Sequence, residues 1–219
     1  MRLGVRPIVF LGRLLVCLLL AYVVWRPVEP AYTELLGTLT RSFLHMTERT
    51  SDPELRYVTE MRVRQTSEGR PAIFFQHVRY PEVQSGIPAE WVQANLVLLI
   101  PLMLAMPAAS YSQRFTRLGV ALVIAVAVQV IDIAVTVKAT YAFHPLTGMA
   151  YTNLARTIYG FGDAFFQSFD TQLFPVVIWA GIHFNQLLGR TPSHPRPAAA
   201  PQPRRKRKAA RKLASPKVS

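Results

Sequence analysis

The stretch LGVALVIAVAVQVIDIAVTV, residues 118–137, decides the fold class, because it is apolar over the length that a membrane-spanning helix needs. A bilayer core about 30 Å thick is crossed by a helix of about 20 mostly apolar residues. Asp132 is the one acidic residue in this stretch. Placing it in the membrane costs about 2.5–3.5 kcal/mol, but each Leu, Ile or Val nearby contributes about 0.3–0.6 kcal/mol of favourable insertion. The stretch therefore predicts a spanning helix that can retain its carboxylate.

Three further apolar stretches flank it, at residues 7–25, 91–109 and 165–188. The first contains Arg13 and resembles a signal peptide, but no A-x-A-like cleavage site follows it, so we expect an uncleaved anchor. The fold class predicted is mainly α, a four-helix transmembrane bundle with a small extracytoplasmic α/β segment. We expect four regions: 1–25, 26–89, 90–188 and a disordered basic tail at 189–219.

Composition excludes an ordinary soluble enzyme. Of 219 residues, 51% are hydrophobic and 17% are charged, whereas soluble domains typically carry about 25% charged residues. Cys17 is the single cysteine, which excludes an internal disulfide and a Cys-rich metal site.

The net charge of +13 is distributed unevenly, and this distribution predicts the topology. If the N-terminus is cytoplasmic, the inner segments (1–13, 110–117 and 189–219) hold 15 basic residues and no acidic ones. The outer segments are nearly balanced, because residues 26–89 hold eight Arg and eight acidic residues. The positive-inside rule then places both termini in the cytoplasm, as four spans require. We expect a multi-pass protein of a bacterial-type inner membrane.

The extracytoplasmic segment, residues 26–89, is predicted to hold one amphipathic helix at 33–46 and a β-hairpin formed by strands at 55–66 and 72–80. Two functions are open for it: a structural cap, or a docking surface for another membrane or periplasmic protein through a strand edge or the Arg-rich face. His45 and His77 have no ligand partners at metal-binding spacing, so no metal site is predicted.

A polar stripe runs along the third span, and we expect it to face other helices. With acidic and basic residues from the third external loop it is predicted to form a cluster near the outer leaflet. Two roles are open: hydrogen bonding between helices, or a substrate or proton site centred on Asp132. The predicted cluster consists of Gln129, Asp132, Thr136, Arg156, Asp163 and Asp170.

The external loop at 139–164 opens a region rich in aromatic residues, and we expect a short interfacial helix near 149–159. Its rings would form either an aromatic belt or a shallow groove for a lipid-linked or peptide substrate. The tail favours anionic lipid and offers no specific nucleic-acid site. Its predicted lipid contacts are Arg204, Arg205, Lys206, Arg207, Lys208, Arg211 and Lys212.

The chain carries none of the motifs G-x-S-x-G, H-E-x-x-H, G-x-G-x-x-G or the P-loop, so it predicts no catalytic residues, no cofactor and no metal. Its layout, with Trp25 and Pro27 ending the first span and Asn95 near the start of the second, resembles the small multi-pass proteins that accompany exosortases. The resemblance implies a non-catalytic accessory subunit in envelope protein sorting or polysaccharide export. It would bind a partner or a lipid-linked substrate at the outer face. The alternative is a membrane-embedded enzyme or proton-coupled carrier that uses Asp132.

Overall fold

The computed structural model describes residues 7–48, 57–106, 110–169 and 173–187. The protein is mainly helical and has a small three-stranded antiparallel sheet. In chain order the elements are α1 (Pro7–Thr47), β1 (Thr59–Gln65), β2 (Pro71–His77), β3 (Gln84–Pro88), α2 (Ala89–Ala105), α3 (Tyr111–Phe143), the 3₁₀ turn η1 (Gly148–Ala150), α4 (Asn153–Phe169) and α5 (Leu173–Leu187).

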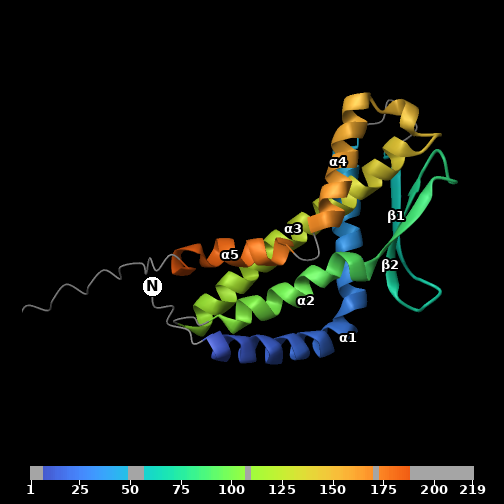
Figure 1. Cartoon of the computed structure of the whole chain (residues 1–219). Helices are drawn as coiled ribbons and strands as arrows, with labels where there is room; N and C mark the ends of the chain where they lie inside the picture. Colours follow the sequence, from blue (N-terminus) through green and yellow to red (C-terminus); the bar gives the residue numbers. More distant parts are fainter. Residues whose placement is uncertain (1–6, 49–56, 107–109, 170–172, 188–219) are drawn as a thin grey trace, which may run out of the picture.

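Figure 1 shows two parts set at an angle. The helical arm consists of the first half of α1, α2, α5 and the N-terminal part of α3. The sheet lobe consists of the second half of α1, the sheet, η1, α4 and the C-terminal end of α3. Helices α1 and α3 run through both parts and join them.

Helix α1 is one helix of 41 residues, which corrects the prediction of a span ending at Trp25 and a separate helix at 33–46. Pro27 and Pro30 lie inside it. Proline removes a backbone N–H and clashes with the preceding turn, so it bends a helix or ends it. Here α1 changes direction between the arm and the lobe without ending (Figure 1).

The sheet confirms the predicted hairpin and adds a third strand. Strands β1 and β2 pair antiparallel with Met61 opposite Phe75, and β3 pairs with the other edge of β2. The residues of strand β3, QSGIP, lack an alternating apolar pattern. Its Gly86 lies opposite Phe74, and a Cβ added there would come within 2.8 Å of the Phe74 ring. That absence of pattern is why the sequence did not predict β3.

Two clusters of buried side chains form the core, one in each part. In the sheet lobe, α1, the sheet and α3 meet at Leu36, Phe75 and Tyr141, each at most 1% exposed. In the helical arm, Leu99 of α2 and Ala121 of α3 belong to one cluster of buried side chains. Because Ala121 is small, the two helix backbones can approach closely.

Among the residues that the structure describes, two helices, α1 and α3, are long and apolar enough to cross a membrane by length and composition. Helices α2 and α5 are shorter, with 17 and 15 residues. The predicted fourth span at 165–188 is corrected: α4 ends at Phe169 and α5 begins at Leu173. The helix expected near 149–159 is observed as η1 followed by α4, which begins at Asn153 and extends to Phe169, and its interfacial position stays a prediction. The four-helix transmembrane bundle stays a prediction.

Candidate functional site

The predicted polar cluster is divided between two helix contacts. Gln129 is fully buried and joins three helices: it accepts a hydrogen bond from the Tyr32 hydroxyl of α1 and donates one of 2.6 Å to the Val92 carbonyl of α2. This is the pattern of a side chain that holds helices together.

The second contact joins α3 to α4. The Thr136 hydroxyl donates to Asp163 Oδ1 at 2.8 Å, and Gln167 Nε2 donates to Asp163 Oδ2 at 2.8 Å. Arg156 donates instead to the Gly148 carbonyl at 2.5 Å, which ties α4 to η1. Asp132 is half-buried. Asp170 and the seven basic tail residues lie outside the described residues.

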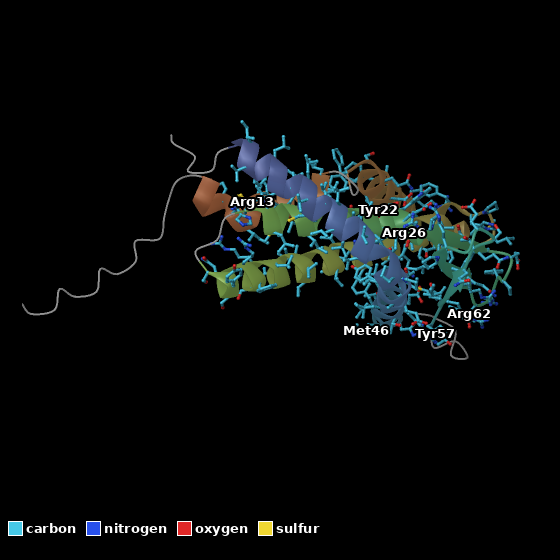
Figure 2. All side chains as sticks on the ribbon, turned by 90° about the horizontal axis from the view of Figure 1, so that it is seen from below. Arg13, Tyr22, Arg26, Met46, Tyr57 and Arg62 are labelled. Atoms are coloured by element: carbon cyan, nitrogen blue, oxygen red, sulfur yellow. The ribbon has the colours of Figure 1, made fainter. Side chains whose placement is uncertain are left out.

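A groove lies where α1 meets α2 and the turn between β1 and β2. Its volume is about 420 Å³. Figure 2 shows Tyr22 and Arg26, two of its residues, near the end of the first half of α1. The groove is lined by Tyr22, Trp25, Arg26, Glu29, Arg70, Glu90, Gln93, Ala94 and Val97.

The inner wall of the groove is held by Gln93, which is 1% exposed. Its side-chain oxygen accepts from Trp25 Nε1 at 3.2 Å, and its amide nitrogen donates to the Thr33 hydroxyl at 2.5 Å and to the Glu29 carbonyl at 3.4 Å. The Trp25 ring also packs edge-on against Tyr32, with 5.4 Å between ring centroids. Gln93 therefore fixes α2 against α1 at the bend.

The groove carries two guanidinium groups and two carboxylates. Arg70 and Glu90 form an ion pair at the mouth, where both side chains are about half exposed. Arg26 donates to the Tyr22 hydroxyl at 3.1 Å, and its guanidinium lies 5.5 Å from the centre of that ring. Exposed ion pairs are weak, so these groups are available to exchange partners with a ligand. The site can hydrogen-bond phosphate, hydroxyl or ammonium groups beside an aromatic surface.

A buried ion pair lies deeper in the sheet lobe. Lys138 Nζ of α3 lies 2.6 Å from Glu48 Oε1, and the Glu48 side chain has no exposed surface. The same carboxylate accepts hydrogen bonds from the backbone amides of Val58 and Thr59, each at 2.9 Å, and from the Thr59 hydroxyl at 2.5 Å. Burial alone would raise the pKa of Glu48, but Lys138 and these hydrogen bonds outweigh it, so the pKa lies below its ordinary value.

Sequence reasoning missed both the groove and the buried pair. Glu48 and Lys138 are 90 positions apart, so no local pattern in the sequence links them. The position of Trp25 and Glu90 at the ends of two apolar stretches could have indicated the groove, because both residues line it. The bend that brings them together could not be predicted, because the first span was expected to end near Trp25 and Pro27.

Within the described ranges, no group of three or more His, Cys, Asp or Glu side chains could hold a metal ion. No family model matches the chain, and neither a curated protein nor a solved structure is significantly similar to it.

Proposed function

We propose that this protein is an integral inner-membrane accessory or assembly subunit that binds the polar headgroup of a lipid or lipid-linked substrate at the outer face. The groove is the binding site. In this proposal the chain crosses the membrane four times, with both termini in the cytoplasm and the sheet lobe outside.

The first support is the exposure of the apolar residues of α1. The most apolar window of this helix has none of its residues buried, and Ile8 and Val23 are 84% and 68% exposed. Such a surface is costly in water and favourable in lipid. With 15 basic and no acidic residues on the cytoplasmic side, the positive-inside rule sets the orientation.

The short helices α2 and α5 are compatible with spanning. At 1.5 Å per residue, their 17 and 15 residues give lengths of about 25 and 22 Å. Both lie below the average bilayer core of about 30 Å, and local thinning of the bilayer can accommodate such a mismatch.

The observation that carries the proposal is the position of the groove. It lies where the helical arm meets the sheet lobe, and this is headgroup depth if the arm spans the membrane (Figure 1). Trp and Tyr side chains favour that depth, because one end of each is apolar and the other is polar. A volume of about 420 Å³ lies within the range of small-molecule sites.

Native mass spectrometry of protein released from vesicles of phosphatidylethanolamine and phosphatidylglycerol tests the groove. Wild type should retain lipid, and Arg26→Gln should reduce retention about tenfold, because a charge-assisted hydrogen bond contributes about 1.5 kcal/mol. Arg62→Gln is the matched control, since Arg62 lies on β1 and pairs with Glu60 outside the groove. Equal retention by all three proteins would contradict the site.

The exosortase-like layout assigns the subunit to envelope protein sorting or polysaccharide export, and this assignment is also a proposal. The edge of β1 that does not pair with β2 is a surface on which a partner strand could dock. Affinity purification in mild detergent should then recover a stoichiometric membrane or periplasmic partner. A monodisperse monomer without such a partner would count against an accessory role.

A further inference from the structure

The apolar and polar faces of helix α4 are placed the opposite way round from those of a surface helix in a soluble protein. It is strongly amphipathic, yet none of its residues is buried. A surface helix normally turns its apolar stripe towards the core. The apolar stripe of α4 is instead exposed, and follows helical spacing along the whole element: Leu154, Ile158, Phe161, Phe165 and Phe169.

The polar side of α4 is the side that packs on the protein. Asp163 accepts a hydrogen bond from Thr136 of α3. A Cβ added at Gly160 would come within 2.8 Å of the Phe143 ring, and one at Gly162 within 2.9 Å of Val135. These glycines bring the backbone of α4 close to α3, which leaves the apolar stripe facing away from the protein.

The exposed stripe continues onto α5. The rings of Phe165 and Phe166 lie 6.1 and 5.8 Å from the Phe174 ring at the start of α5. Beyond Phe174, α5 exposes Val176 and Val177. The stripe and the surface of α5 that the proposed topology assigns to lipid therefore form one apolar surface.

The direction of α4 matches a helix that lies along a membrane. It runs crosswise to α5 in Figure 1, and the view turned by 90° shows α4 nearly end-on while the arm helices extend across the picture (Figure 2). If the arm crosses the bilayer, α4 lies in its plane. The charged residues of α4 are Arg156 and Asp163, and both bond to groups of this chain.

We propose that α4 lies flat in the outer leaflet, with its apolar stripe inserted among the acyl chains just below the headgroups. Interfacial helices bury their apolar face about 5–10 Å deep at this boundary. Because no charged residue of α4 is left for headgroups, the insertion is driven by apolar area and does not depend on anionic lipid. This inference rests on the proposed membrane insertion of the arm.

Spin-label accessibility in vesicles of phosphatidylethanolamine and phosphatidylglycerol tests this inference. Cysteines replace Ile158 and Phe161 one at a time in a Cys17→Ala background, and collisions with oxygen are compared with those of a water-soluble nickel chelate. Both labels should favour oxygen, and the result should be unchanged in vesicles of neutral lipid. A label at Arg62 on β1 is the matched control and should favour nickel.

A label at Leu19 of α1 separates failure of this inference from failure of the proposed topology. If Leu19 favours oxygen while Ile158 and Phe161 favour nickel, α4 does not enter the leaflet. If Leu19 also favours nickel, the arm is not in lipid and the proposed function fails with it. Dipolar broadening at Phe161 that disappears on dilution with unlabelled protein would instead assign the stripe to a second copy, which overturns the inference.

Discussion

At Glu48, two backbone amides, a hydroxyl and an ammonium group converge on one carboxylate that has no exposed side-chain surface. This carboxylate joins the end of α1 to β1 and α3. Removing one partner of such a buried pair is costly, because the other charge remains without compensation.

Glu48→Gln should therefore destabilise the sheet lobe by about 3 kcal/mol, since Lys138 would lose its counter-charge in a largely buried place. Denaturant unfolding in detergent, monitored by hydrogen exchange of the β1 amides, measures the change in the free energy of unfolding. Glu60→Gln is the control, because its ion pair with Arg62 is exposed and contributes at most about 1 kcal/mol. Equal losses in the two variants would show that the buried pair contributes no special stability.

The same pair predicts a loss of stability in acid. The pKa of Glu48 is lower in the folded protein than its ordinary value of 4.5, so the unfolded state binds more protons at low pH. The contribution of Glu48 to folding stability is present above about pH 4.5 and is lost as the pH falls through the pKa of the folded state. Burial also lowers the pKa of His77, so a second loss of stability begins as the pH falls below 6.5, the ordinary pKa of histidine. Because the Glu48 carboxylate raises the pKa of His77, Glu48→Gln also changes the contribution of His77 below pH 6.5. The contribution of Glu48 itself appears as a melting-temperature difference between wild type and this variant that should shrink below pH 4.5. A constant difference down to pH 3 would contradict the assignment.

A substitution at Asp132 distinguishes an accessory subunit from a membrane-embedded enzyme or proton-coupled carrier that uses this carboxylate. Since the groove is formed by α1, α2 and the turn between β1 and β2, Asp132→Asn should leave lipid retention and protein level unchanged. The measurement is native mass spectrometry together with complementation of a deletion strain. Loss of function at a normal protein level would favour the enzyme or proton-coupled carrier.

Single residues were predictable where they broke a pattern. Gln129 could be predicted as a helix contact because it interrupts an apolar stretch, and the structure places it in contact with α1 and α2. Its partner Tyr32 could not be predicted, because it lies 97 positions away and beyond a bend. The hydrogen bond between Thr136 and Asp163 joins two residues of the predicted cluster. The buried Glu48 could not be distinguished in the sequence from the other charged residues of the segment 26–89.

At the scale of elements, the crossing of α1 over β1 depends on one small residue. A Cβ added at Gly37 would come within 2.8 Å of Val63 Cγ2. Valine is branched at Cβ and has little freedom to move aside.

Gly37→Ala should therefore be less stable than wild type by about 1–2 kcal/mol despite the better helix propensity of alanine. Gly119→Ala is the matched control, since no atom lies within 4 Å of its added Cβ. Combining Gly37→Ala with Val63→Ala should remove the penalty, as measured by a double-mutant cycle of unfolding free energies. An equal cost of Gly37→Ala in both backgrounds would show that the contact does not limit the crossing.

Apolar length and alternation predicted α2, α3 and the β1–β2 hairpin with approximate ends. Two elements were mispredicted because tertiary packing overrode local signals. The first span was expected to end at Trp25 and Pro27, but residues on both sides of the prolines of α1 are held by packing, so the helix continues through the bend. The sequence prediction assigned the aromatic residues after Asn153 partly to a loop and partly to a span. In the structure they lie at helical spacing on one helix, α4.

At the scale of the whole molecule, we propose that the helical arm lies in the membrane and the sheet lobe lies outside it. Composition predicted the apolar helices, and charge asymmetry predicted the orientation. The angle between the arm and the lobe was not predictable, because it depends on the bend in α1 and on contacts between residues distant in sequence (Figure 1).

Cysteine accessibility in intact cells tests this claim most directly. In a Cys17→Ala background, Arg62→Cys reports on the sheet lobe, and Ser112→Cys reports on the start of α3, where the proposed topology places the chain in the cytoplasm. A membrane-impermeant maleimide should label Arg62→Cys in intact cells and Ser112→Cys only after permeabilisation. Labelling of Ser112→Cys in intact cells, or protection of Arg62→Cys until the cells are opened, would contradict the topology and place the groove on the wrong side of the membrane.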